Sequence, residues 1–429
     1  MVSVVIIGIL FICLIAGFPM VVGMIGSSIA AILIFFPKIS MPILMQNLVT
    51  GISSSTLLAV PMYILAAEIM CSGKSGEKLF GAVRILLGHL PGGVAVASIG
   101  SCTLFGAISG STQATLVAVG RPMYGQLRKI GYTPSHALAM LASSANIALL
   151  IPPSICMIMY AICGKGVSLA ELFIAGVVPG ILLFVFFSIY EIITARIKHI
   201  PRTAKPSAKE VGKTLKEAIL PFGFPVLILG GIYAGWFSPT EAAAVAVAYA
   251  FILEAIVYRS MKVKEFCKAA LSTGVTTATV FILAAAGQVL SFVISYAGIP
   301  QSIASAVIES NMGATGFLFV VAACFFVSCM FVDSIPVILI LVPIFFPIAT
   351  SLGINEIHLG VLVTLQAAIG CITPPFGCNI FTASAIFDQS FSTIVKGLWP
   401  YVVLFVATTV LIIVFPDISL SLVKTAFGG

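Results

Sequence analysis

Apolar runs follow one another along almost the whole chain, and they restrict its fold more than any other feature. They cover residues 2–17, 19–36, 56–71, 94–108, 137–151, 172–194, 219–236, 241–258, 275–298, 313–332, 334–350, 360–372 and 398–415. A full membrane span needs about 20 apolar residues, so several runs suffice alone and the shorter ones suggest broken or re-entrant segments. With 60% hydrophobic and 8% charged residues, the chain is predicted to be an all-α polytopic membrane protein, a single integral unit over residues 1–429.

Basic residues indicate which connections face the cytoplasm. The longest polar stretch, residues 195–218, carries seven Lys and Arg residues and two Glu residues, and the positive-inside rule predicts a cytoplasmic loop. Basic residues recur at 259–268, two apolar runs later, whereas the intervening turn "GWFSPTE" has none. The formal net charge of +7 therefore reflects topology and contact with anionic membrane lipid. Nucleic acid is not expected as a partner.

Two segments share the spacing of their helix-breaking residues. When residues 106–155 are set against 328–377 at an offset of 222, a glycine and a histidine coincide, and Pro152-Pro153 falls on Pro374-Pro375. A polar break, Ser111 in one segment and Asp333 in the other, precedes each Pro-Pro pair by the same distance. Many transporters are built from two related halves with the binding site between them. The spacing predicts such an inverted repeat.

The interruptions in the apolar runs predict a site. In hydrocarbon, non-helical backbone survives only where protein buries it or where it lines a water-filled cavity. We interpret "SGST" and "MFVDSIP" as the tips of two re-entrant helical hairpins, and each Pro-Pro pair as a helix break. Carbonyls freed at a break can coordinate a cation, and helix N-termini can hold an anionic group.

At several positions, a purely structural role is an alternative to a role in the predicted binding site. The spacing of Gly106 and Gly110 is also typical of close helix packing, and a membrane Ser or Thr often bonds its own helix carbonyls. Five polar side chains lie within residues 109–115, which is more than hydrogen bonding to the carbonyls of their own helix explains. Asn146 needs several partners when buried. Asp333 is the only acidic residue between 310 and 355, which favours function over a simple hairpin cap.

The sequence contains no motif that indicates nucleotide binding or enzymatic catalysis. "SGKS" at 72–75 has no upstream glycine at P-loop spacing, so ATP is not expected to supply the energy. No HExxH or GxSxG motif suggests an intramembrane enzyme. The ten cysteines form no CxxC pair and are interpreted as apolar fillers. No organic cofactor is expected.

The chain resembles the large membrane subunit of the tripartite ATP-independent periplasmic (TRAP) transporters. The similarity runs over nearly its whole length and lies in "FGAISGSTQATLVAVG", "LLIPPSICMIMY", "ELFIAGVVPGILL", "FVDSIPVILILVPIFFPIATSLGI" and "IGCITPPFGCNIF". It implies a sodium-coupled importer of an organic acid in the bacterial inner membrane. "GSTQAT" and "IALLIPPSI" are more similar to the sialic-acid branch than to the C4-dicarboxylate branch.

The resemblance also implies partners and a mechanism. The partners are a small four-helix membrane subunit and a periplasmic substrate-binding protein. The mechanism is an elevator movement, in which a transport domain moves across the membrane against a scaffold. The transport domain is expected at residues 90–165 and 310–390, with the remaining helices as scaffold.

Site residues carry over from the family by position. The first sodium site would use residues of the first hairpin tip and first break: Ser109, Gly110, Ser111, Ser144 and the backbone near Asn146. The second would use residues of the second tip and break: Asp333, Thr373, Gly377 and Asn379. The substrate would lie between them, near Thr112, Gln113, Asn146 and Ser154.

Two alternatives remain at this point. A stand-alone sodium/dicarboxylate symporter is also built from paired hairpins and would transport without a binding protein. A channel or membrane-embedded enzyme would need an open polar pore or catalytic groups, neither of which the sequence offers.

Overall fold

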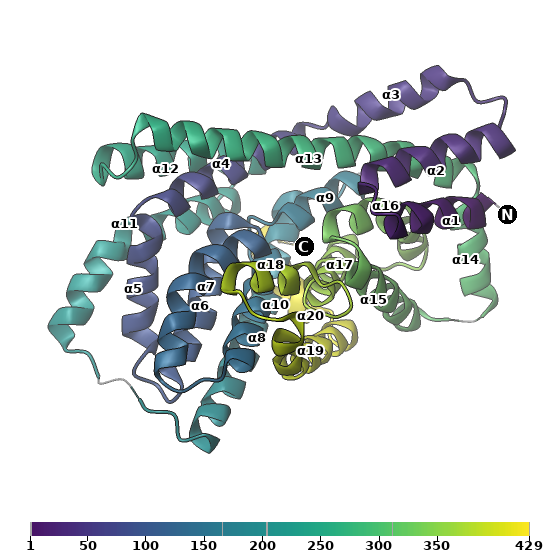
Figure 1. The fold of residues 1–429 in the computed structure, drawn as a ribbon. Helices are drawn as coiled ribbons and strands as arrows, with labels where there is room; N and C mark the ends of the chain where they lie inside the picture. The colour runs from purple at the N-terminus through teal and green to yellow at the C-terminus, as the bar shows by residue number, and fades with distance from the viewer. Residues whose placement is uncertain (1, 165, 203–204, 311, 429) are drawn as a thin grey trace.

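A computed structural model describes residues 2–164, 166–202, 205–310 and 312–428, and these residues form helices and short connections without a strand (Figure 1). Eight helices are long and apolar enough to cross a membrane: Ser55–Ser72, Leu169–Ile197, Ala208–Tyr233, Pro239–Val257, Val263–Tyr296, Ala314–Phe331, Ser334–Ser351 and Phe391–Val414. The predicted all-α polytopic fold is confirmed.

The chain divides into two halves of similar element order. The first contains α1 (Val2–Ile15), α2 (Met20–Phe35), α3 (Met41–Ile52), the 3-10 turn η1 (Ser55–Leu58), α4 (Ala59–Ser72), α5 (Ser75–Leu87), α6 (Gly93–Ser109), α7 (Thr112–Lys129), α8 (Pro134–Ala145), the 3-10 turn η2 (Asn146–Leu149), α9 (Ile155–Cys163) and α10 (Leu169–Ile197). The second contains α11 (Ala208–Tyr233), α12 (Pro239–Phe251), the π turn η3 (Ile252–Val257), α13 (Val263–Tyr296), α14 (Ile299–Glu309), α15 (Ala314–Phe331), α16 (Ser334–Ser351), α17 (Glu356–Gly370), α18 (Cys378–Phe387), α19 (Phe391–Val414) and α20 (Asp417–Phe427).

The offset of 222 residues relates these halves well beyond the two segments that suggested it. It matches the first residue of α7 with that of α16, of α8 with that of α17, and of α10 with that of α19. It also matches the start of α3 with the start of α13, and the end of α5 with the end of α14. The repeat therefore extends over most of the chain.

Both hairpin tips form where the sequence placed them. Helix α6 ends at Ser109 and is followed by Gly110, whose φ of +58° suits a residue without a side chain, and the Ser111 side chain caps α7. A Cβ on Gly110 would lie 2.2 Å from the Pro153 carbonyl oxygen, so the tip approaches the first break too closely for any other residue. At the second tip, Asp333 caps α16.

Both Pro-Pro pairs interrupt helices. Pro152 and Pro153 lie between η2 and α9, and Pro374 and Pro375 lie between α17 and α18. The bond within each pair is cis. Around the second break, the Asn379 N–H donates to the Cys371 carbonyl at 3.0 Å, and the Phe376 N–H donates to Met330 of the second hairpin at 3.1 Å. The second hairpin thus satisfies one of the N–H groups that the second break leaves free.

Each hairpin packs on the broken helix of the other half as well as on its own. Helix α7 contacts α18, and its equivalent α16 contacts α9. Each hairpin also contacts its own half's broken helix, through α6 with η2 and through α15 with α17. As a result, the N-termini of α7, α9, α16 and α18 converge on one region between the halves.

The helices form an inner and an outer set. The inner helices (α6–α10 and α15–α20) carry the hairpins and breaks, and α10 and α19 pack on them. The outer helices (α1–α5 and α11–α14) lie along the top and both flanks of the inner set in the view of Figure 1. The inner set is larger than the sequence-based segments 90–165 and 310–390, because it includes α10, α19 and α20.

The two sets meet through different hairpin helices in the two halves. In the first half, α6 makes the main contacts to the outer helices α4 and α5. In the second half, α16 makes them to α13 and α14. Since α6 corresponds to α15 and not to α16, the repeat is asymmetric at this interface.

Small residues allow each hairpin to approach its own broken helix. A Cβ on Gly106 would lie 2.6 Å from Ala148 Cα, and one on Gly370 would lie 2.2 Å from Cys329 Cβ. The offset pairs Ala148 with Gly370, so the glycine lies on the hairpin in one half and on the broken helix in the other.

We predict that Gly106→Ala and Gly370→Ala each destabilise the protein, because an added methyl at these contacts costs about 1–3 kcal/mol through overpacking. The thermal unfolding midpoint of the purified protein should fall in both variants. Gly125→Ala is the control, because no atom of the described residues lies within 4 Å of a Cβ built at Gly125. Equal midpoints in all three variants would contradict the described packing.

Candidate transport site

The first hairpin tip holds a cluster of hydroxyl groups. Ser109 Oγ lies 2.9 Å from Thr115 Oγ1, and both hydroxyls reach the Ser111 carbonyl, at 3.2 Å and 2.8 Å. Ser111 Oγ donates to Gln113 Oε1 at 3.3 Å. The cluster therefore presents several oxygen atoms where the backbone changes direction, which is the donor chemistry that a sodium ion prefers.

Two asparagines join the halves at the centre of the site. Asn379 Nδ2 donates to Asn146 Oδ1 at 2.5 Å, and Thr112 Oγ1 donates to Asn379 Oδ1 at 3.0 Å. All three side chains are buried. Asn146 lies where α8 passes into η2, and Asn379 lies in the first turn of α18, so this chain of bonds connects both broken helices to the first hairpin.

Several buried polar atoms beside this chain have no partner among the described residues. They are Asn146 Nδ2, Ser143 Oγ and Ser144 Oγ. An unpaired buried polar group costs about 1–3 kcal/mol, so such a group indicates a missing ligand or water. The hydroxyl oxygens suit a cation, whereas Asn146 Nδ2 can donate only to an acceptor such as a carboxylate.

Asp333 faces an opening at the second tip. Its side chain is exposed although protein surrounds it on most sides, and it accepts from the Ile335 N–H at 3.4 Å. Gln113 of the first hairpin and Cys378 lie within hydrogen-bonding reach of its carboxylate. The two tips thus meet through Gln113, which also donates to Cys378 Sγ at 3.5 Å.

Two cysteines that the sequence suggested were fillers lie at this position. A carboxylate oxygen of Asp333 and the Sγ atoms of Cys371 and Cys378 all lie within 4.8 Å of one another. Two thiols and a carboxylate form a donor set for a soft metal ion, whereas sodium prefers oxygen.

The remaining expected site residues lie at the two breaks, where Thr373 and Ser154 hydrogen-bond the backbone of their own segments. Thr373 Oγ1 donates to the Ile369 carbonyl at 2.7 Å, and Gly377 precedes α18. Ser154 is fully buried and caps α9 by accepting from the Met157 N–H at 3.4 Å. The Asn379 side chain, which the resemblance assigned to the second sodium site with Asp333, bonds Asn146 and Thr112.

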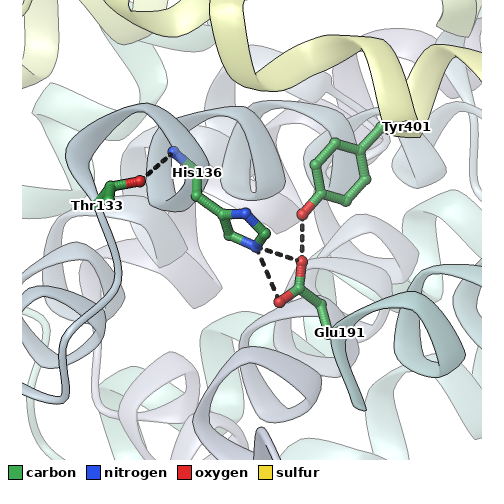
Figure 2. Close-up of polar contacts among 4 residues, drawn as sticks. All are labelled: Thr133, His136, Glu191 and Tyr401. Atoms are coloured by element: carbon green, nitrogen blue, oxygen red, sulfur yellow. Dashed lines mark hydrogen bonds and ion pairs between the residues drawn. The ribbon is translucent and has the colours of Figure 1, made fainter. Parts of the chain in front are cut away.

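A buried polar triad holds the first broken helix in place (Figure 2). His136 Nε2 of α8 donates to the Glu191 carboxylate of α10, at 2.8 Å and 3.0 Å from its oxygens, and the Tyr401 hydroxyl of α19 donates to the same carboxylate. The equivalent histidine, His358, bonds Ser419 Oγ at 2.7 Å. Glu191 was not among the residues predicted from the sequence, although it is the single acidic residue within the apolar run 172–194 and could have been found by that signal.

We predict that Glu191→Ala lowers the thermal unfolding midpoint markedly, because it leaves the His136 Nε2–H and the Tyr401 hydroxyl buried without their acceptor, at about 1–3 kcal/mol for each unsatisfied group. Glu191→Gln should lose less, since it keeps the size and one acceptor oxygen. Glu217→Ala is the control, because that carboxylate is half exposed in its ion pair with Lys78. If Glu191→Ala unfolds like the control, the triad does not fix α8.

Comparison with known proteins gives a consistent assignment. A family model described as "Tripartite ATP-independent periplasmic transporter, DctM component" matches residues 7–418. The ectoine TRAP transporter large permease protein TeaC of Halomonas elongata is 48% identical, over 96% of this chain and 97% of the relative. The ectoine/5-hydroxyectoine large permease UehC of Ruegeria pomeroyi is 45% identical, over 98% of each chain.

A sialic acid large permease is more distant. SiaM of Vibrio cholerae is 31% identical, over 89% of this chain and 90% of the relative. Among solved structures, the YdaH transporter of Alcanivorax borkumensis superposes with a TM-score of 0.63 over 87% of each chain. Its identity of 16% limits that likeness to the fold.

The family match and the eight candidate spans make the chain a multi-pass protein of the bacterial inner membrane, and a transporter subunit rather than an enzyme. The two hairpins, the two broken helices and the match over residues 7–418 lead to one assignment. The chain belongs to the DctM family, the large permease component of the TRAP transporters.

Proposed function

We propose that this permease imports ectoine, or a similar cyclic zwitterion with one carboxylate, in a sodium-coupled elevator cycle. A periplasmic binding protein would deliver the substrate, and a small four-helix membrane subunit would complete the transporter. The observation that carries the proposal is the polar region between the halves, where four helix N-termini, the Asn146–Asn379 pair and Asp333 come together. Two relatives named as ectoine permeases, at 48% and 45% identity, support the substrate.

The charges of the site suit a zwitterion. Ectoine carries a carboxylate and a cyclic amidine that is protonated at neutral pH. The carboxylate would meet the helix N-termini and the unpaired Asn146 Nδ2, and the amidinium would meet the exposed Asp333 carboxylate. A C4-dicarboxylate or sialic acid would bring no cation to Asp333. We therefore replace the sialic-acid and C4-dicarboxylate expectations with ectoine.

The sodium ions would bind beside the substrate. One would lie at the hydroxyl cluster of Ser109 and Ser111 with Ser144, and the other at the carbonyls freed around Thr373 and Gly377. In this arrangement Asp333 supplies negative charge to the second half of the site, and we assign its carboxylate to the substrate rather than to sodium because the thiols of Cys371 and Cys378, which are poor sodium ligands, lie within 4.8 Å of it.

The moving part would be the inner helices, and the outer helices would be the scaffold. The hairpins lie between the site and the outer helices α4, α5, α13 and α14, so a sliding movement there would carry the site across the membrane. In the first half α6 contacts the outer helices, and in the second half α16 does. This difference between the halves is expected of a transporter in one of the two end states of an elevator cycle.

The basic residues orient the chain. All described Lys and Arg residues except Lys38 and Lys424 lie in or nearest to connections on the side of residues 195–218. We place this side in the cytoplasm by the positive-inside rule. Thr203 and Ala204 of this segment lie outside the described residues.

We predict that labelled ectoine enters proteoliposomes only when the permease, its small subunit, the binding protein and an inward sodium gradient are all present. No nucleotide-binding motif offers another energy source. Uptake should fall to background when potassium replaces sodium or when the binding protein is omitted. A normal rate without the binding protein would instead support the stand-alone symporter.

We predict that Asp333→Asn raises the half-saturating ectoine concentration at least tenfold at saturating sodium, because the variant keeps the size but loses the charge that faces the amidinium. The half-saturating sodium concentration should change less. Asp388→Asn, at the C-terminal end of α18, is the matched control. An unchanged ectoine dependence would refute this placement of the substrate, and a larger effect on sodium would make Asp333 a sodium ligand.

A further inference from the structure

A cavity of about 780 Å³ lies between the outer helices and the base of the first hairpin. Its walls come from α5, from the start of α11 with the residues before it, and from the ends of α6 and α7 that lie away from the hairpin tip. Three of its lining residues are cationic: Arg84 on α5, Lys129 at the end of α7, and Lys205 before α11. The cavity therefore joins both helix sets at the end of the molecule that we place in the cytoplasm.

These three cations lack a carboxylate partner among the described residues. The one acidic residue in the lining, Glu210, is engaged by Ser207, whose N–H and hydroxyl both donate to it at 2.8 Å. Nearby, outside this lining, Lys78 does pair with Glu217 at 3.3 Å. His89 adds to the same wall a buried Nδ1 atom that has no hydrogen-bond partner in the described part of the chain. The cavity thus has an excess of positive charge that the protein itself does not neutralise.

We propose that this cavity binds the phosphate of an anionic phospholipid headgroup from the cytoplasmic leaflet. Basic pockets between membrane helices on the cytoplasmic side suit anionic lipid headgroups, because nearby Lys and Arg residues attract them and the lipid is already at that depth. Inorganic phosphate shares the chemistry but must come from solution. The orientation rests on the proposed function, whereas the binding site does not depend on which substrate is carried.

The position of the cavity gives the lipid a regulatory role. Arg84 and Lys205 belong to the outer helices and their connection, whereas Lys129 belongs to the first hairpin. A phosphate held by both would bridge the proposed scaffold and the proposed moving part. It would therefore favour the arrangement in which α6 packs on α5.

The test measures lipid binding without transport. Purified permease in nanodiscs of zwitterionic phosphatidylcholine is titrated with phosphatidylglycerol, and the thermal unfolding midpoint is followed. The triple variant Arg84→Gln, Lys129→Gln, Lys205→Gln removes the cavity charges, and all three side chains are exposed, so folding should survive. The control, Lys209→Gln, Lys213→Gln, Lys216→Gln, removes the same charge from α11 outside the lining.

The expected result is a rise in midpoint with phosphatidylglycerol for the wild type and the control. The cavity variant should need at least about tenfold more anionic lipid for half the effect. Native mass spectrometry should show the same difference in retained phosphatidylglycerol. Equal responses of the two variants would overturn the proposal, as would a full response to inorganic phosphate alone, which would assign the site to a soluble ligand. Because no uptake is measured, failure here leaves the ectoine proposal untouched.

Discussion

A helix that stops inside a membrane leaves terminal N–H and C=O groups without partners, and hydrocarbon provides none. This chain stops helices at two hairpin tips and two Pro-Pro breaks, and its fold meets the constraint by placing these interruptions against one another. Gly110 at the first tip packs directly against the Pro153 carbonyl of the first break. At the second break, the Phe376 N–H donates to the Met330 carbonyl of the second hairpin. The region that cannot face lipid thereby becomes the polar region between the halves.

The local features of this arrangement could be predicted from sequence. Gly110, Asp333 and the Pro-Pro pairs act on their own backbone, so their residue types locate the tips and breaks directly. The offset of 222 residues, seen first in two segments, holds from α3 to α19. The family, and with it the multi-pass inner-membrane location, followed from the same motifs.

The contacts between distant elements could not be predicted in this way. The bonds of the Asn379 amide to Asn146 and Thr112 were not predicted, because they depend on the packing of α18 on α7. Cys371 and Cys378 approach Asp333 only because the break folds back on itself. Glu191 bonds residues from α8 and α19, which lie far apart in the sequence. Such pairings depend on three-dimensional packing that no single segment encodes.

The asymmetry between the halves allows the central claim, that the inner helices move against the outer ones, to be tested directly. In the opposite end state of an elevator cycle, the two halves should exchange their contacts with the outer helices. Each contact that one half makes here should then form between the equivalent residues of the other half. A Cβ on Gly287 of α13 would lie 2.9 Å from Leu339 of α16. The equivalent residues are Leu65 of α4 and Val117 of α7, and Val117 is exposed in this arrangement.

The decisive measurement is disulfide cross-linking of Leu65→Cys with Val117→Cys, in a background whose native cysteines are replaced by serine. The account predicts that this pair cross-links during ectoine uptake and that the cross-link stops transport. Gly287→Cys with Leu339→Cys should cross-link in the arrangement described here. If the Leu65–Val117 pair never cross-links under turnover while transport continues, the elevator account is contradicted.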